Sequence, residues 1–348
     1  MSTHHKVYYK KAQQMEEVED NSVALVITSP PYPMIEMWDE IFSLQNEEIK
    51  AALEVGDGLL AFEKMHEELD KIWKELYRVV IPGGIICVNI GDATRTINKN
   101  FQIFPSHSRI ITAYQKLGFQ NLPEILWRKQ TNAPNKFMGS GMLPPGAYIT
   151  LEHEYILIFR KDEKREFKTE ALKENRRESG YFWKERNIWF SDVWDFKGIS
   201  QDLSNKEMRK RSAAYPFELA FRLINMFSVR NDIILDPFLG TGTSSLAAMV
   251  SERNSIGYEI DVNFKEIIKE RFLEVISFGN KYIQNRINSH LSFITERIKE
   301  KGPTKYTNAN LNVSVITSQE KDLKINKLSS IKEINKEFVL KYKKINGN

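Results

Sequence analysis

The sequence predicts an α/β fold in which a parallel sheet is flanked by helices. Short apolar runs, typical of buried strands, alternate along the chain with longer segments whose apolar residues recur at helical spacing. With 348 residues, the chain is long enough for one large α/β domain and an accessory part. Its 41% hydrophobic and 28% charged residues fit a globular protein and exclude collagen-like, low-complexity and wholly disordered chains.

The first half of the chain is punctuated by residues that end strands and helices. Pro30 and Pro31 must end the first strand, because proline has no amide hydrogen for sheet pairing. Residues 129–148 are rich in Asn, Pro and Gly, and such a long irregular segment is a candidate functional one. The predicted elements are a strand at 22–28, a helix at 62–80, a buried strand at 85–90, a helix at 106–117, and strands at 125–128 and 155–160.

The second half contains an interruption and a change of composition. Residues 161–212 are highly charged and rich in aromatic side chains, and we interpret them as an insertion. Beyond residue 273 the chain becomes Lys-rich and predicts mainly helix, with a short strand at 311–316. The elements expected between these segments are a helix at 216–227, a strand at 232–235, a helix at 244–250, a strand at 255–258 and a helix from 263. We therefore divide the chain into a main domain, 1–272, and a basic, mainly helical C-terminal extension, 273–348.

The net charge of +4 is unevenly distributed. Residues 301–348 hold ten Lys and four Asp or Glu, a net +6, which leaves −2 on the first 300 residues. This asymmetry favours an acidic partner such as nucleic acid. The alternative is a Lys-rich tail that is only solvated.

The cysteine count and the apolar runs indicate the cellular setting. The single cysteine, Cys87, lies in an apolar run, so there is no disulfide framework and no zinc site of paired cysteines, and we expect no metal. His153 and Glu154 begin a zinc-protease pattern, but Leu157 stands where its second histidine would be. No apolar run is long enough to cross a membrane, and no apolar stretch follows the basic N-terminus. We expect a cytoplasmic protein without membrane contact.

A glycine-containing turn between a strand and a helix predicts a nucleoside cofactor site. The turn reads Asp-Pro-Phe-Leu-Gly-Thr-Gly-Thr over residues 236–243, and its glycines let the backbone approach a ligand closely. Glu259 ends the next strand, near the spacing of about 20 residues at which an acid grips ribose hydroxyls. A third glycine in register is missing, so the turn does not match a dinucleotide fingerprint. The alternative is a turn that only packs tightly.

A second motif, Thr-Ser-Pro-Pro-Tyr at residues 28–32, predicts a site for a planar amino group. The two prolines fix the backbone, so the Ser29 hydroxyl and the Pro30 carbonyl are held as acceptors beside the aromatic ring of Tyr32. Two acceptors on the hydrogens of a ring amine favour a tetrahedral nitrogen aimed at an electrophile. The alternative is a simple Pro-Pro turn at the end of a strand.

Together, the two motifs resemble those of the S-adenosylmethionine-dependent DNA methyltransferases that modify exocyclic amino groups. The catalytic motif comes first and the cofactor motif about 200 residues later, which is similar to the circularly permuted β group of that family. The resemblance covers roughly residues 7–272 and includes the stretches 76–84 and 152–159. It implies a Rossmann-like class I methyltransferase fold, circularly permuted, with an inserted DNA-recognition region and the basic C-terminal extension.

The resemblance also implies roles for individual residues. Segment 213–218 is similar to the one that touches the methionine end of the cofactor, but it lacks the histidine found in many relatives. Double-stranded DNA would present its target base flipped out, at a cost of about a few kcal/mol, and Tyr32 would stack on that base. Cys87 lacks a Pro-Cys motif, which argues against methylation at carbon 5 of cytosine. The implied catalytic residues are Ser29, Pro30, Pro31 and Tyr32, and the implied cofactor residues are Asp236, Phe238, Gly240, Gly242, Thr243, Glu259 and Tyr215.

Serine in the first position of the catalytic motif is typical, within this family, of enzymes that methylate N4 of cytosine. We therefore expect a site-specific cytosine-N4 methyltransferase of a restriction-modification system, with a cognate restriction endonuclease as a partner. Adenine-N6 methylation by the same fold is the alternative. Two further alternatives are a protein-glutamine methyltransferase and an inactive DNA-binding relative. The first would carry Asn in the first position of the catalytic motif, with the cofactor motif upstream of it. The second would have lost the glycines of the cofactor motif or the Pro-Pro-Tyr of the catalytic motif.

Two segments, 129–148 and 161–212, are the candidates for DNA recognition, because both offer side chains that reach phosphates or base edges. The alternative is a solvated charged face. We interpret three tryptophans of the second segment as parts of a local core, and the alternative is that bases stack on them. They are Trp183, Trp189 and Trp194. The candidate DNA-binding residues are Lys129, Asn132, Lys136, Arg176, Arg177, Arg209 and Arg211.

Overall fold

A ten-stranded sheet forms the centre of the computed structural model, which describes residues 1–129, 138–197 and 215–345. Strands β3, β2, β11, β12 and β1 run parallel, and β9 lies antiparallel between β3 and β6. The strands, in their order across the sheet, are β10 Val193–Asp195, β6 Gln120–Arg128, β9 His153–Arg160, β3 Val80–Ile90, β2 Val23–Thr28, β11 Ile233–Asp236, β12 Asn254–Tyr258, β1 Ser2–Tyr8, β16 Glu337–Lys344 and β15 Asn326–Ile334. The predicted α/β class is confirmed.

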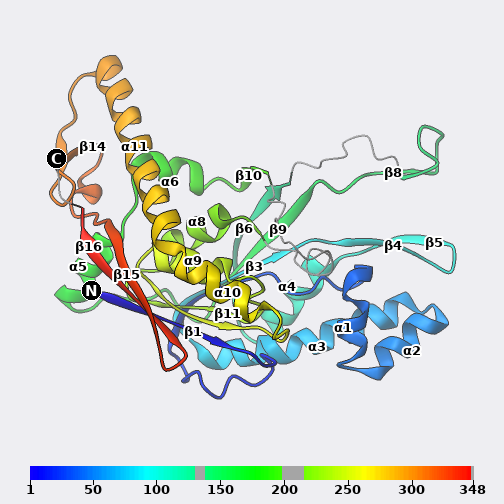
Figure 1. The fold of residues 1–348 in the computed structure, drawn as a ribbon. Coiled ribbons are helices and arrows are strands. Elements are labelled where there is room, and N and C mark those ends of the chain that lie inside the picture. The colour runs from blue at the N-terminus through cyan, green and yellow to red at the C-terminus, as the bar shows by residue number, and fades with distance from the viewer. Residues whose placement is uncertain (130–137, 198–214, 346–348) are drawn as a thin grey trace.

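Helices cover both faces of the sheet (Figure 1). On β2, Leu25 and Ile27 pack into one hydrophobic cluster and Val26 into the other, because successive side chains of a strand point to opposite faces. This central strand is buried on both sides, which explains why β2 reads as a continuous apolar run. Helices α3 Gly58–Val79 and α4 Ser106–Lys116 cover one face, and α8 Phe217–Phe227, α9 Thr243–Val250, α10 Phe264–Leu273 and α11 Val275–Lys301 cover the other.

The strand order reverses between β2 and β11. From β2 the chain passes through α3 to β3 on one side, and from β11 it passes through α9 to β12 on the other. The carboxyl ends of β2 and β11 are therefore neighbours, and the segments that follow them diverge to leave a crevice. Ligands of open α/β sheets bind at such a switch point. The two motifs of the sequence, about 200 residues apart, begin at these two strand ends.

The C-terminal extension differs from its prediction. In the described part of the extension, helix is limited to α11 and a short 3-10 turn, Ser318–Glu320. The short strand expected at 311–316 is β14 Val313–Val315, paired with β13 Tyr306–Asn308. The hairpin β15–β16 then joins the central sheet beside β1, so 273–348 is not mainly helical. Asn335 and Lys336 form its two-residue turn, with positive φ of 51° and 64°. The sequence did not predict this turn, because Lys336 stands where such turns usually have glycine. Six of the ten lysines in 301–348 lie in this hairpin, and five of them are exposed, as is common at the edge of a sheet.

The charged insertion contributes structure around the edge of the sheet. It contains α5 Glu170–Glu178, α6 Trp183–Trp189 and β10, which pairs with β6. Trp189 and Trp194 are buried, as expected, whereas Trp183 is 40% exposed and stacks on Phe293. Within the described residues, no helix is long and apolar enough to cross a membrane, and no group of three His, Cys, Asp or Glu is placed to hold a metal.

Two hairpins that the sequence did not predict project from the carboxyl edge of the sheet. One is β4 Ala93–Ile97 with β5 Asn100–Phe104, and the other is β7 Met138–Gly139 with β8 Ala147–Tyr148. Both extend toward the side of the molecule that holds α1 Asp39–Ser43 and α2 Glu47–Val55 (Figure 1). The rings of Phe101 and Tyr148 stack with centroids 4.3 Å apart, so the hairpins contact each other.

Candidate active site

The two sequence motifs lie side by side at the switch point. Val26 pairs with Leu235 across β2 and β11, which brings Thr28 and Asp236 to the same edge of the sheet. The Thr28 hydroxyl donates a hydrogen bond of 2.9 Å to Asp236 Oδ1. The first residue of one motif is thus bonded to the first residue of the other.

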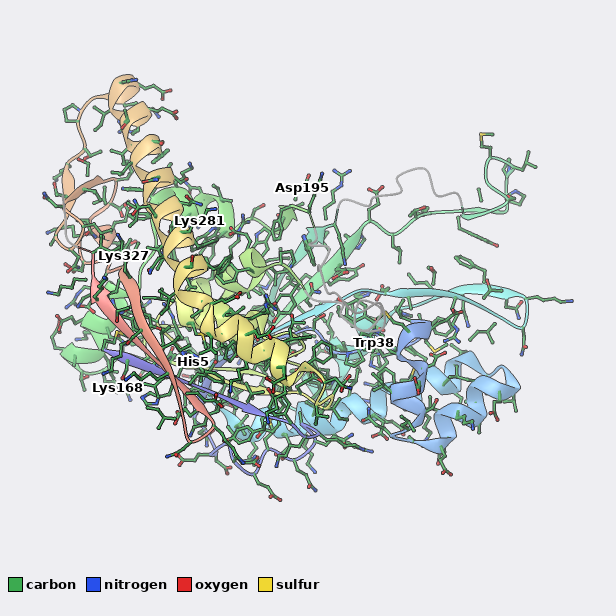
Figure 2. All side chains as sticks on the ribbon, in the orientation of Figure 1. His5, Trp38, Lys168, Asp195, Lys281 and Lys327 are labelled. Carbon is green, nitrogen blue, oxygen red and sulfur yellow. The ribbon has the colours of Figure 1, made fainter. Side chains whose placement is uncertain are left out.

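A cleft opens above this contact. It is lined mostly by apolar side chains with a few polar groups, as ligand-binding clefts usually are. Trp38, just before α1, lines the cleft and is labelled in Figure 2. Of the predicted site residues, the cleft is lined by Ser29, Pro30, Pro31, Tyr215, Asp236, Phe238, Gly240, Thr243 and Glu259. Gly242 and Tyr32 lie next to these residues in the chain.

Asp236 acts as a buried anchor at the base of the cleft. Its Oδ1 accepts from Thr28 and from the Phe238 amide at 3.0 Å, and its Oδ2 accepts from Tyr215 at 3.2 Å and from Ser244 at 2.6 Å. Burial raises the pKa of this carboxyl, and the four donors oppose that shift. The side chain thereby ties β2, β11, α9 and the segment before α8 into one unit.

The two glycines of the turn serve different purposes. Gly240 has a φ of +54°, and no atom lies within 4 Å of where a Cβ would stand. Gly242 has a φ of +84°, and a Cβ there would come within 2.9 Å of the Phe272 ring. Gly240 therefore keeps the cleft open, and Gly242 lets the turn pack against α10.

Glu259 lies at the end of β12, facing the turn. One carboxylate oxygen accepts from the Gly240 amide and the other from the Asp261 amide, both at 2.8 Å. Burial raises the pKa of this carboxyl to about 7, although the two amide donors lower it. Each oxygen keeps a lone pair, so the carboxylate is able to accept the hydroxyls of a ribose.

At the other end of the cleft, a polar cluster surrounds the catalytic motif. The Ser29 hydroxyl donates to Tyr32 Oη at 3.2 Å, and the Tyr32 hydroxyl donates to Glu154 Oε2 at 2.9 Å. Asn89 Nδ2 donates to Tyr32 Oη at 2.8 Å and to Glu154 Oε2 at 2.7 Å. Lys129 pairs with the other oxygen of Glu154 at 2.8 Å. Four separate elements, the β2 loop and the ends of β3, β6 and β9, thus converge on one group.

Sequence reasoning missed two members of this cluster, Asn89 and Glu154. Asn89 is 3% exposed within the otherwise apolar β3, and Glu154 lies at the start of the apolar β9. A polar residue at the edge of a buried strand was the available signal. Cys87, by contrast, is fully buried within β3, as expected, and burial raises the pKa of its thiol.

The structure brings one of the candidate DNA-binding residues to this site. Lys129 lies in the cluster, and its Nζ is 5.4 Å from the centroid of the Trp127 ring. Arg176 and Arg177 belong to α5, on the opposite side of the molecule from α1, and Lys168 in Figure 2 marks that side. Arg177 pairs there with Glu170. The other candidates, Asn132, Lys136, Arg209 and Arg211, lie outside the described residues.

Comparisons with known proteins agree with this geometry. The model of the N6_N4_Mtase family, described as DNA methylase, matches residues 23–270. The Type II methyltransferase M.MthZI of Methanothermobacter thermautotrophicus is 53% identical over 99% of this chain and 97% of its own length. A DNA modification methylase of Thermus thermophilus, solved in complex with S-adenosyl-L-methionine, is 31% identical, with a TM-score of 0.58 over 78% of this chain and 95% of that one.

A more distant structure shares the architecture. The PvuII cytosine-N4-specific DNA methyltransferase is 16% identical, with a TM-score of 0.54 over 80% of this chain and 92% of that one, and it supports the fold alone. The predicted Rossmann-like class I fold is confirmed by these matches. The chain belongs to the N6_N4_Mtase family of DNA methylases.

Proposed function

We propose that this protein is a site-specific DNA methyltransferase that transfers a methyl group from S-adenosylmethionine to the exocyclic N4 of cytosine in a short double-stranded sequence. One observation carries the proposal: the cleft beside the cofactor turn and a rigid Ser-Pro-Pro-Tyr motif meet at the switch point, joined by the Thr28–Asp236 hydrogen bond. The similarity to M.MthZI, a Type II methyltransferase, supports a role as the modification enzyme of a restriction-modification system beside a cognate endonuclease.

The turn between β11 and α9 fits S-adenosylmethionine. Gly240 leaves open space beside the backbone, and Glu259 offers two carboxylate oxygens at the end of the neighbouring strand, where a ribose would lie. Tyr215 and Phe238 line the same cleft. When bound, the cofactor supplies an electrophilic methyl group on a sulfonium. The chain itself would hold the two reactants close together and in line.

The target amino group would bind at the catalytic motif. Ser29 donates its own hydrogen to Tyr32, so the lone pairs of its oxygen are able to accept a hydrogen from the amine. The Pro30 carbonyl is the second acceptor, and Pro30 and Pro31 hold both groups rigidly. Serine at this position favours cytosine N4 over adenine N6, as in similar family members. Lys129, which pairs with Glu154 at the rim, would contact DNA.

The test is to express the protein in a host free of DNA methylation and to analyse the genomic DNA by nucleoside mass spectrometry and single-molecule sequencing. The proposal predicts N4-methylcytosine at one short motif. N6-methyladenine would overturn the choice of base and keep the fold and the site. No modified base, despite tight binding of S-adenosylmethionine by the purified protein, would contradict the proposal.

A further inference from the structure

The cluster around Tyr32 forms a directed chain of hydrogen bonds that leads away from the site of methyl transfer. We propose that Ser29 and Tyr32 pass a proton from the methylated amino group to the carboxylate of Glu154. This inference rests on the proposed function, and it gives the Tyr32 hydroxyl a role that stacking on a base does not require. Neither Glu154 nor Asn89 belongs to the Ser-Pro-Pro-Tyr motif.

The direction of the chain follows from its donors. The Ser29 hydroxyl donates to Tyr32 Oη, and the Tyr32 hydroxyl donates to Glu154 Oε2, over 3.2 and 2.9 Å. Asn89 has only donors to offer from Nδ2, and it donates to both the Tyr32 oxygen and the Glu154 carboxylate. With its oxygen accepting from Asn89 and Ser29, the Tyr32 hydroxyl has its hydrogen directed at Glu154. Each hydrogen therefore already points toward the next acceptor.

The reaction creates the need for such a path. As the amino nitrogen attacks, its lone pair forms the new bond to carbon, and the electrons of the old carbon–sulfur bond remain on sulfur. The nitrogen then carries a positive charge and one proton too many. That proton passes to Ser29 Oγ, the Ser29 hydrogen passes to Tyr32 Oη, and the Tyr32 hydrogen passes to Glu154, which becomes a neutral acid. No oxidant or other co-reactant is required.

The other carboxylates of the site are committed elsewhere. Asp236 already accepts four hydrogen bonds and lies at the foot of the cofactor turn. Glu259 accepts a hydrogen bond from the Gly240 amide in that turn. Asp92 accepts hydrogen bonds from the backbone amide and the ring of His107. Among the described residues, Glu154 is the carboxylate hydrogen-bonded to the Ser29–Tyr32 pair. Burial and the nearby carboxylate raise the pKa of Tyr32 well above its usual value, so the hydroxyl keeps a hydrogen to pass on.

A route from Glu154 to solvent is present. The Glu154 side chain is 13% exposed, and the Lys129 side chain that pairs with it is 48% exposed. The groups that face the carboxylate are Tyr32 from the β2 loop, Asn89 from β3 and Lys129 from the end of β6. Lys129 stabilises the ionised acceptor before transfer, and water at the rim is able to take the proton afterwards.

The test compares two conservative variants, Tyr32→Phe and Glu154→Gln, with the wild type and with Tyr155→Phe as a matched control. Tyr32→Phe keeps the ring and removes one oxygen atom. Tyr155 lies on the same strand as Glu154 and stacks on His107, outside the chain of hydrogen bonds. Single-turnover methyl transfer is measured on a duplex containing the target motif. Base flipping is followed separately by 2-aminopurine fluorescence at the target position, and folding by thermal unfolding.

We expect Tyr32→Phe and Glu154→Gln each to slow methyl transfer by about 10²-fold, the scale of general acid–base catalysis, while 2-aminopurine fluorescence changes less than twofold. The double variant should be no slower than either single variant, because both break one path. Tyr155→Phe should match the wild type.

Two results would overturn the relay. One is a Tyr32→Phe variant that transfers methyl within twofold of the wild type, and the other is a double variant whose loss is the product of the single losses. Both require an active wild-type enzyme. A wild type that methylates no DNA would instead contradict the proposed function, so the two failures are distinguishable.

Discussion

The two ends of the cleft are built in different ways. At the cofactor end, most contacts come from the backbone of one continuous turn, which the carboxylates of Asp236 and Glu259 hold through its amides. At the base end, side chains from four separate elements meet around Tyr32. The cofactor end is therefore sensitive to backbone conformation, and the base end to individual side-chain atoms. Changes at the two ends should separate cofactor binding from methyl transfer.

Gly240→Asp should have the largest effect. An L-residue at a φ of +54° is strained, and the new carboxylate would occupy the open space of the cleft next to Glu259. We expect S-adenosylmethionine affinity to fall at least about 10²-fold in isothermal titration calorimetry, because the site is both filled and made more negative. Gly302→Ala is the control, since Gly302 also has a positive φ and open space but ends α11. Equal affinity in wild type and Gly240→Asp would contradict the assignment.

Tyr32→Ala should show the opposite pattern. It removes both the stacking ring and the hydroxyl that Asn89 and Glu154 hold, while the cofactor turn is untouched. We expect kcat to fall by about 10² to 10³-fold and the Kd for S-adenosylmethionine to change less than threefold. Steady-state kinetics and calorimetry on the same preparation check this. Equal losses in kcat and in the affinity for S-adenosylmethionine would mean that the two ends of the cleft do not act independently.

The pH dependence of cofactor affinity should sharpen the comparison. With a pKa of about 7, Glu259 is mostly protonated at pH 6 and mostly ionised at pH 8. Ribose hydroxyls bind best to the ionised form, so affinity should weaken by about tenfold from pH 8 to pH 6. In Glu259→Gln, affinity should be weak and nearly constant over this range. A wild-type affinity that does not change between pH 6 and 8 would exclude this role for Glu259.

The smallest effect is expected for Arg177→Ala. Arg177 pairs with Glu170 on α5, on the side of the molecule opposite α1, whereas Lys129 lies in the base-end cluster. We expect the affinity for duplex DNA to change less than twofold in Arg177→Ala and more in Lys129→Ala, measured by fluorescence anisotropy at one salt concentration. A larger loss for Arg177→Ala would place DNA over α5 instead.

The same contrast explains what could be predicted from the sequence. The cofactor turn was predictable because its residues are contiguous and the reasons for its glycines are local. The cluster at the base end was not, because the parallel pairing of β2 and β3 brings Asn89 to Tyr32, and the antiparallel pairing of β3 and β9 adds Glu154. Single polar residues at the ends of apolar strands have many roles, and only the sheet order identifies theirs.

The fold shows a similar division. Buried central strands and the helices between them were predicted because apolar runs and Pro or Gly breaks mark them clearly. Strand β1 was missed, because His4 and Lys6 alternate with buried residues in a short polar N-terminus. The hairpin β15–β16 was predicted as helix because its lysines hide the alternation of an edge strand. In both cases long-range pairing decides the structure over local propensity.

Transfer of a methyl group from S-adenosylmethionine to an amino nitrogen of DNA at this cleft is the central step of the proposed function. The measurement is to incubate the purified protein with unmethylated plasmid and S-adenosylmethionine carrying a CD3 group, and to analyse the nucleosides by mass spectrometry. The wild type should produce N4-(trideuteromethyl)cytosine, and Ser29→Ala and Gly240→Asp should produce little or none. Labelled DNA from Gly240→Asp at the wild-type level, or no label from the wild type, would contradict the account.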